Sequence, residues 1–112
     1  MNKFTVIWSD AATDAVIDIV TGFGVEHIQL AEKIADEIFE AGNSLASFAL
    51  RGRVVPELDK LGETSLREIF HKPWRMVYEV VERTAVILLV IDGRRDCEEL
   101  LRELLLRKKF SP

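Results

Sequence analysis

The segment from residue 66 to residue 96 constrains what this chain can fold into more than any other part. It holds three runs of strand-forming residues separated by short breaks, at residues 66–70, 74–81 and 85–91. The first break is Lys72-Pro73, and proline cannot continue a strand ladder and also restricts the residue before it. These features predict three strands that follow one another as an antiparallel meander.

Polarity along the runs predicts how the sheet is covered. The middle run alternates, with Trp74, Met76, Tyr78 and Val80 on one face and Arg75, Val77, Glu79 and Val81 on the other. The last run, AVILLVI, is apolar at every position, which is typical of an interior strand buried on both faces. It leads into a charged loop, DGRRD, at residues 92–96. This loop is therefore the first candidate for a functional site.

Helical periodicity precedes and follows the sheet. Residues 11–21 and 26–49 each carry an apolar stripe, and the short glycine-containing turn between them predicts an antiparallel helical hairpin that covers the sheet. We expect the stripe of the second helix to run inward from Ile28 to Phe48.

The remaining segments complete the predicted order. A strand is expected at residues 4–8 and an amphipathic C-terminal helix at residues 97–110, whereas residues 51–63 show no period and are expected to form a loop. The predicted fold is α+β, in the order β-α-α-β-β-β-α, within a single domain spanning residues 1–112.

The composition narrows the class of protein. No apolar run approaches the roughly 20 residues that span a bilayer, and the N-terminus turns acidic before a signal-like segment develops. We therefore expect a cytoplasmic protein without membrane association. Cys97 is the only cysteine, so an internal disulfide is impossible.

Charge is divided unevenly between the two halves of the chain. The net charge is −4, but residues 1–50 carry two cations against eight acids, and residues 51–112 carry thirteen cations against eleven acids. An anionic partner is therefore expected to meet the second half. The net negative charge of the whole chain argues against a general nucleic-acid-binding protein.

Motifs for cofactor chemistry are missing from the sequence. It has no phosphate-binding glycine loop, no metal-ligand spacing and no nucleophile elbow, so no cofactor or metal is expected. His27 is expected at the surface where a helix begins, and His71 lies at a turn, where an acid–base role is the alternative to a structural one. Cys97 is interpreted as a small buried apolar residue.

Four arginines are the candidate binding residues: Arg51, Arg53, Arg75 and Arg94. Arginine forks bind phosphate or carboxylate groups bidentately, and a loop folded back over the sheet would bring these side chains to one face.

The alternative for these arginines is internal pairing. Arg75 would then pair with Glu68 or Glu79, and Arg95 would brace the charged loop by pairing with Asp92 or Asp96. We favour internal pairing for Arg95. The leucines of the C-terminal helix likewise have two interpretations, which are core packing and docking into a partner's groove.

Several motifs together resemble one known family. They are GRVVPEL at residues 52–58, LREI at 66–69, WRMVYEV at 74–80 and VILLVIDGRRD at 86–96, preceded by the helical hairpin. In this order they resemble the RelE/ParE toxin superfamily of bacterial type II toxin–antitoxin modules, also called plasmid-stabilisation proteins. The resemblance covers residues 4–96 and implies a small twisted antiparallel sheet covered by the N-terminal hairpin.

The resemblance implies two alternative activities. RelE-like members are ribosome-dependent, metal-independent mRNA endoribonucleases with a basic cluster, which Arg51, Arg53, Arg75 and Arg94 match in part. They also use a tyrosine or histidine near the C-terminus, and this sequence has neither after Tyr78. ParE-like members lack the catalytic set, and the studied ones inhibit DNA gyrase. The sequence therefore favours the ParE-like branch, and a non-toxic binding module of the same fold is a third alternative.

The resemblance also implies partners. A cognate antitoxin, with a ribbon-helix-helix DNA-binding domain, would neutralise the toxin and connect it indirectly to DNA. Its C-terminal segment is expected to contact Arg51, Arg53 and Arg75. The candidates for contact with the target are charged residues of the loop and the C-terminal helix: Arg94, Arg95, Arg107, Lys108 and Lys109.

Overall fold

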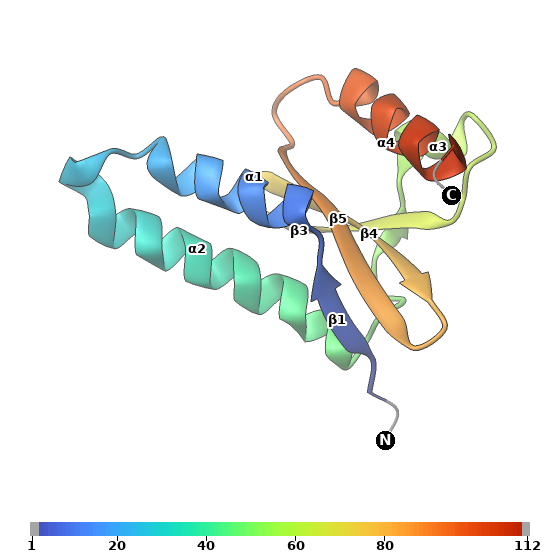
Figure 1. Ribbon diagram of the computed structural model, residues 1–112, viewed down its shortest axis with the longest axis horizontal. Helices are drawn as coiled ribbons and strands as arrows, with labels where there is room; N and C mark the ends of the chain where they lie inside the picture. Colours follow the sequence, from blue (N-terminus) through green and yellow to red (C-terminus); the bar gives the residue numbers. More distant parts are fainter. Residues whose placement is uncertain (1–2, 111–112) are drawn as a thin grey trace.

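A computed structural model describes residues 3–110 of the chain, with side chains through residue 108. Its centre is a five-stranded sheet in the order β1-β5-β4-β3-β2 (Figure 1). The strands are β1 (Thr5–Trp8), β2 (Arg53–Val54), β3 (Leu66–His71), β4 (Trp74–Val81) and β5 (Thr84–Asp92). The helices are α1 (Asp10–Thr21), α2 (Ile28–Asn43), α3 (Pro56–Asp59) and α4 (Glu98–Phe110). The predicted α+β class and antiparallel meander are confirmed.

The hairpin of α1 and α2 packs on one face of the sheet. Helix α1 begins at the N-cap Ser9, whose Oγ accepts a hydrogen bond from the Ala12 N–H at 3.0 Å. The turn after α1 uses Gly24 with φ of +76°, followed by a short 3-10 helix, Val25–His27. Residues from the hairpin and the sheet form one core: Ala12, Val16, Ile38, Leu45, Ala49, Ile69, Met76, Tyr78, Ala85, Ile87 and Val90.

Helices α3 and α4 cover the opposite face (Figure 1). A second core lies beneath them: Val55, Leu58, Leu66, Val77, Ile91, Cys97 and Leu101. Strand β5 therefore has apolar neighbours on both faces, as its continuous apolar run predicts. Cys97 is buried, in agreement with its interpretation as an apolar residue, and burial raises the pKa of its thiol.

A bulge in β5 fixes the start of α1. Tyr78 pairs with Ile87 and Val77 pairs with Leu89, so Leu88 has no partner on β4. The Ile87 carbonyl accepts from the Ser9 N–H at 2.9 Å, and the Leu88 carbonyl accepts from Ser9 Oγ at 3.1 Å. Because of this contact, the chain leaves the sheet after β1 and turns into α1.

The sequence-based prediction was wrong in three details. The sheet is not wholly antiparallel, because β1 pairs with β5 in parallel. Residues 51–63 are not simply a loop, since they contain β2 and α3. These elements have two and four residues, too few to show a period. Helix α2 ends at Asn43 instead of near residue 49, and a 3-10 turn, Ser44–Ala46, follows it.

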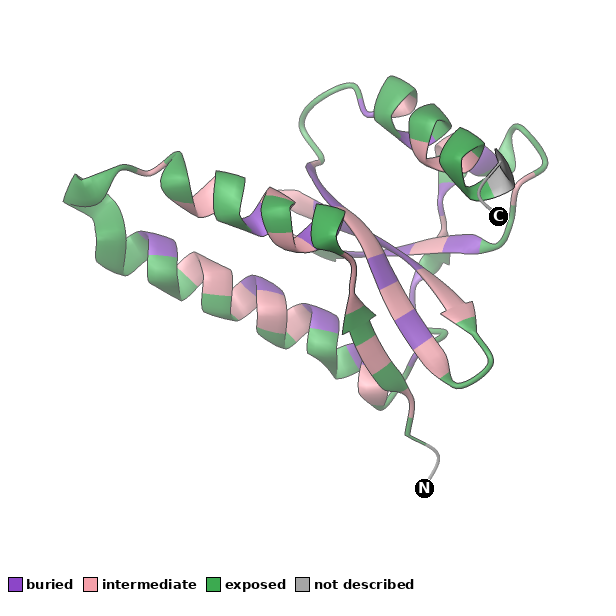
Figure 2. Cartoon of the chain, viewed as in Figure 1, coloured by how far each residue is buried: buried purple, intermediate pink, exposed green. Residues whose placement is uncertain are grey.

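The ends of the predicted α2 stripe are exposed. Ile28 is 56% exposed and Phe48 is 71% exposed, although both were expected to face inward. Ile28 lies where the hairpin projects past the sheet, and Phe48 follows the end of the helix (Figure 2). The middle of the stripe is buried at Ala31, Ile38 and Leu45. No helix within residues 3–110 has the length and apolar character that crossing a membrane requires.

Candidate functional site

An ionic ladder crosses three strands on the sheet face beneath α3 and α4. Arg53 on β2 is directly opposite Glu68 on β3, and Arg75 on β4 lies diagonally beyond it. Glu68 Oε2 accepts from Arg53 Nε at 2.7 Å, and its Oε1 accepts from Arg75 Nε at 2.6 Å. One carboxylate thus holds two arginines.

Helix α3 contributes a second acidic residue to the ladder. Pro56 is favourable at the first helical position, and the next residue, Glu57, reaches Arg75 with both carboxylate oxygens. Arg75 Nη1 donates to Glu57 Oε2 at 2.7 Å, and Nη2 donates to Oε1 at 2.8 Å. This bidentate pairing lowers the pKa of Glu57 to about 2 and raises the pKa of Arg75.

The centre of the ladder, Glu68 and Arg75, is removed from solvent. Arg75 is 6% exposed and Glu68 is 1% exposed. All three guanidinium nitrogens of Arg75 donate to Glu57 or Glu68. The alternative in which Arg75 pairs internally with Glu68 is therefore the one that the structure adopts, with Glu57 added.

The charged loop rests on the stem of Arg75. The Gly93 N–H donates to the Pro73 carbonyl at 2.8 Å, and a Cβ at position 93 would lie 2.9 Å from that oxygen and 3.1 Å from Arg75 Cγ. Only a glycine fits this approach without displacing its neighbours. The ladder therefore connects α3, the sheet and the loop.

Within the loop, Arg94 is the residue that pairs with Asp92. Asp92 Oδ1 accepts from Arg94 N and Nε, both at 3.0 Å, and Oδ2 accepts from Nη2 at 2.8 Å. These bonds lower the pKa of Asp92 to about 2. The predicted pairing of Arg95 with Asp92 or Asp96 is wrong, because Asp92 is turned toward the residue two positions on and Asp96 Oδ1 accepts the Glu98 N–H at 3.1 Å.

On the hairpin face, Gly52 is held by two side chains. Tyr78 is fully buried, and its hydroxyl oxygen accepts from the Gly52 N–H at 2.9 Å, while Arg67 Nη1 donates to the Gly52 carbonyl at 2.7 Å. Tyr78 thus packs in the sheet as predicted, and burial raises the pKa of its hydroxyl.

We expect Gly52→Ala to lower the free energy of unfolding by about 1–3 kcal/mol. The new Cβ would lie 2.6 Å from the Glu68 carbonyl and 2.5 Å from the Tyr78 hydroxyl, and a backbone oxygen has little room to move. Urea unfolding measures the change. Gly22→Ala is the matched control, because Gly22 is helical (φ −65°) and its Cβ would meet nothing closer than 3.4 Å. Equal stability of the two variants would contradict the prediction.

The structure separates the four candidate arginines into different environments. Arg53 and Arg75 share Glu68, whereas Arg51 Nη2 donates to Ser44 Oγ at 2.7 Å and Arg94 pairs with Asp92. The Arg53 side chain is 57% exposed and its guanidinium carbon lies 5.0 Å from the centre of the Phe70 ring.

Two residues of the site were missed in the sequence: Glu57 and Arg67. Glu57 stands in the PEL motif, where a proline followed by an acid indicates the first turn of a helix. Arg67 on β3 lies directly opposite Tyr78 on β4. This neighbour can be found only when the register between the two strands is known.

Helix α4 is fixed to the sheet by packing and by an ion pair. Leu101 is fully buried and Lys108 Nζ lies 2.7 Å from Glu79 Oε2, which favours the core-packing interpretation of the helix. Leu100 is 44% exposed and Arg107 is exposed. The side chain of Lys109 lies outside the described residues.

The histidines are separate from this site. His27 is exposed at the N-cap of α2, as predicted, and His71 Nε2 lies 3.3 Å from Glu37 Oε1 on α2. Among the side chains that the structure describes, no three of His, Cys, Asp and Glu come together as metal ligands.

Comparison with solved structures places this architecture among proteins of toxin–antitoxin systems. A chain of the chromosomal ParDE system from P. aeruginosa matches with a TM-score of 0.68 and 17% identity, over 82% of this chain and 98% of that one. A chain of the RelBE2 toxin–antitoxin complex from Mycobacterium tuberculosis matches with a TM-score of 0.59 and 22% identity, over 82% and 93%. At these identities the likeness establishes the fold.

The family follows from the sequence. The profile of the family described as "ParE toxin of type II toxin-antitoxin system, parDE" matches residues 6–97. The chain belongs to this family and is a toxin of the type II toxin–antitoxin class, which confirms the resemblance found in its motifs. Comparison with curated proteins gave no significant match.

Proposed function

We propose that this toxin arrests growth by inhibiting DNA gyrase and that a cognate antitoxin neutralises it. One observation carries the choice of target. Arg75, the centre of the arginine set that an mRNA endoribonuclease would use, is 6% exposed, and its guanidinium is held by Glu57 and Glu68. Binding a phosphate there would require breaking a buried ion pair, which costs several kcal/mol.

The acid–base candidates support the same choice. Metal-independent RNA cleavage needs a group positioned to move a proton at the scissile phosphate. The Tyr78 hydroxyl is buried against Gly52, and His71 faces Glu37 on the far side of the sheet from α3. The net charge of −4 also disfavours docking on ribosomal RNA. The match to the ParE toxin family agrees with the gyrase alternative.

The antitoxin is proposed from the family and from the neighbours, both of which are named for toxin–antitoxin systems. We propose that Arg51 and Arg53 contact its C-terminal segment, because both are exposed and neither has its whole guanidinium occupied. The third predicted contact, Arg75, is too deeply buried to be reached, so we assign it a positioning role.

A supercoiling assay with purified gyrase and no ribosome tests the target. We expect the toxin to abolish supercoiling and to accumulate cleaved DNA, and we expect an equimolar amount of antitoxin to restore activity. A parallel reaction measures mRNA cleavage on translating ribosomes with the same preparation. A sample that arrests growth and cleaves mRNA, yet leaves gyrase unaffected, would overturn the proposal and make Arg51, Arg53 and Arg94 the residues to replace.

A further inference from the structure

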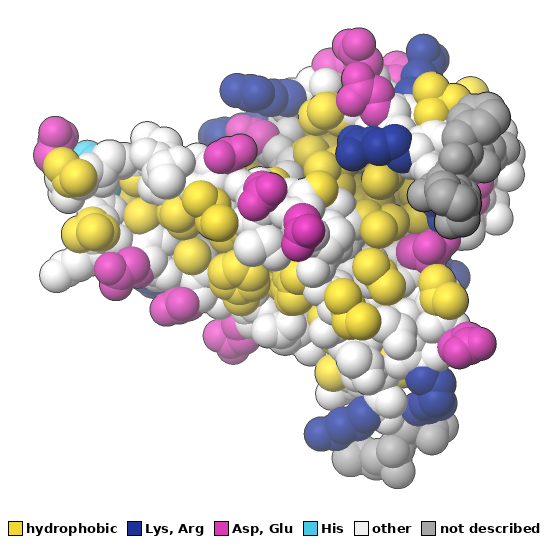
Figure 3. Space-filling view, viewed as in Figure 1, with side chains coloured by type: hydrophobic (Ala, Val, Ile, Leu, Met, Phe, Trp, Pro, Cys, Tyr) yellow, Lys and Arg dark blue, Asp and Glu magenta, His cyan; other side chains and the backbone are white. Residues whose placement is uncertain are grey.

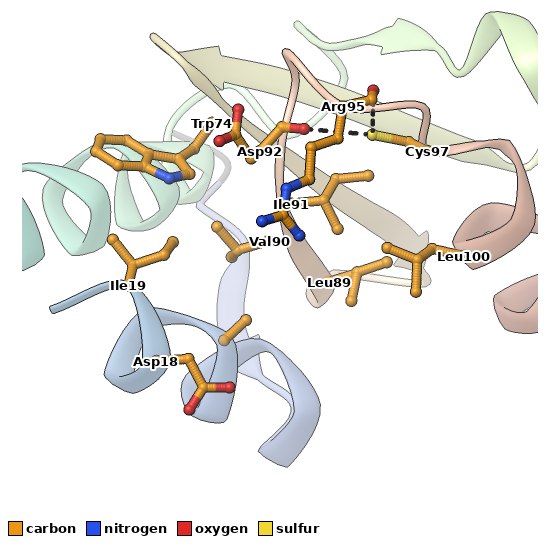
Figure 4. Close-up of a pocket in the computed structure, with 11 residues that line it drawn as sticks. Asp18, Ile19, Trp74, Leu89, Val90, Ile91, Asp92, Arg95, Cys97 and Leu100 are labelled. Atoms are coloured by element: carbon orange, nitrogen blue, oxygen red, sulfur yellow. Dashed lines mark hydrogen bonds between the residues drawn. The ribbon is translucent and has the colours of Figure 1, made fainter. Parts of the chain in front are cut away.

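A groove of about 500 Å³ lies between α1 and the end of β5, apart from the ionic ladder (Figure 4). Its walls are mostly apolar and include Ile19 of α1, Trp74 of β4 and Leu100 of α4. Acidic side chains surround the apolar surface of the hairpin in the same view (Figure 3). The groove is open, so its apolar side chains are available to a partner.

Arg95 projects into this groove from the charged loop. Figure 4 shows its guanidinium extending over the β5 residues Val90 and Ile91. Its nearest acids in the sequence are engaged elsewhere, since Asp92 pairs with Arg94 and Asp96 Oδ1 accepts the Glu98 N–H where α4 begins. Asp18 lies on the opposite wall, but no ion pair within 4.0 Å forms between described residues and Arg95. The loop therefore places an exposed cation, without an ion pair among the described residues, in a groove whose lining is mostly apolar but includes Asp18 and Asp92.

The floor of the groove is an open strand edge. Strand β1 pairs with β5 only as far as Trp8 and Ile87, after which the chain turns into α1. On its other side β5 remains paired with β4 as far as Asp92. Within the described chain no strand pairs with the outer edge of residues 89–91. Such an edge accepts an added extended segment through backbone hydrogen bonds.

These features of the groove determine which kind of partner segment can bind in it. A segment that covers the groove would remove the Arg95 guanidinium from water, and burying an unpaired charge is unfavourable. An occupant that brings a carboxylate for Arg95, apolar side chains for the walls and a backbone for the β5 edge would match all three features of the groove. We propose that an extended apolar segment of the antitoxin, carrying one acidic side chain, binds here with its carboxylate on Arg95. This inference rests on the proposed antitoxin partner.

Affinity for the full-length antitoxin encoded beside this gene tests the inference. Arg95→Gln is expected to weaken binding roughly 10- to 100-fold, the range for loss of a charge-assisted hydrogen bond. Arg102→Gln is the matched control, because Arg102 is also an arginine near the start of α4, is exposed and does not line the groove. It removes the same charge and is expected to bind like the unmodified toxin. Circular dichroism confirms that both variants are folded.

Two further measurements locate the contact. Hydrogen exchange is expected to slow on complex formation at those amides within residues 89–91 that point away from β4, because the others already face β4 in the free toxin. Arg95→Glu is expected to bind more weakly than Arg95→Gln, and replacing the antitoxin's acidic residues with lysine, one at a time, is expected to identify one change that restores affinity.

The outcomes separate this inference from the proposed function. If the unmodified toxin binds the antitoxin and Arg95→Gln binds equally well, the groove is not the site and the proposed function stands. If Arg95→Gln keeps full antitoxin affinity but no longer inhibits gyrase, the groove belongs to the target and the inference is overturned. If the unmodified toxin does not bind the antitoxin, the proposed partner and this inference fail together.

Discussion

Replacing Arg75 with methionine is expected to lower the free energy of unfolding by about 3–5 kcal/mol, the usual cost of removing one member of a buried ion pair. Methionine preserves the aliphatic stem on which Gly93 rests, so the change isolates the charge. It leaves Glu68, whose side chain has no exposure, without Arg75 and leaves Glu57 with 25% exposure and no partner. Urea unfolding at pH 7 measures the loss.

Two comparisons make this result specific. Arg102→Met removes an exposed i,i+4 pair and is expected to cost no more than about 0.5 kcal/mol. Arg75→Met combined with Glu68→Gln is expected to recover part of the stability, because the buried carboxylate left by the single change is neutralised. A loss below about 1 kcal/mol for Arg75→Met would mean that the ladder contributes little to the folded state.

Acid is expected to destabilise the protein through Glu57. The folded pKa of Glu57 is about 2, below its ordinary value of 4.5, so the folded state favours the ionised carboxylate. The resulting stability is fully present above pH 4.5 and is lost as the pH falls toward 2. A difference of this size corresponds to at most about 3 kcal/mol, and solvent screening of the Glu57 side chain, which is 25% exposed, reduces the contribution. Unfolding measured between pH 7 and pH 2 follows the loss.

The control for this prediction is Glu57→Gln. It is expected to be less stable than the unmodified protein at pH 7, with the difference between the two shrinking as the pH falls below 4.5. Asp92 also has a pKa of about 2, but it is paired at the surface and salt should screen its contribution. The measurement is therefore made at high ionic strength. A difference that stays constant with pH would show that Glu57 does not contribute through its charge.

Most of the fold could be predicted from local sequence patterns. Strand β4 has the predicted limits, Trp74–Val81, and β5 differs by one residue at each end, because alternation and continuous apolar runs are local signals. Strand β2 and the parallel pairing of β1 depend on contacts between distant segments. No period in a two-residue strand predicts such contacts.

The site was harder to predict than the fold for the same reason. The sequence suggested Glu68 or Glu79 as the partner of Arg75. Glu68 could be suggested because the two residues lie on strands that follow one another in the meander and pair. Glu57 joins them only because α3 folds over the sheet. The ion pair with Asp92 was predicted for Arg95, but Arg94 makes it. Which arginine pairs depends on the direction of the Asp92 side chain, and the sequence does not show that direction.

The approach of Gly93 to Arg75 has a consequence for how this toxin can diversify. The loop backbone is anchored by the contacts of Gly93 with the Pro73 carbonyl and with the buried stem of Arg75, whereas the side chain of Arg95 is exposed and makes no ion pair among the described residues. If Arg95 contacts the antitoxin as proposed, a substitution at this position changes that contact while the Gly93 anchor of the backbone stays the same. Under that proposal, the specificity of the toxin for its antitoxin is separable from the contacts that keep the loop folded.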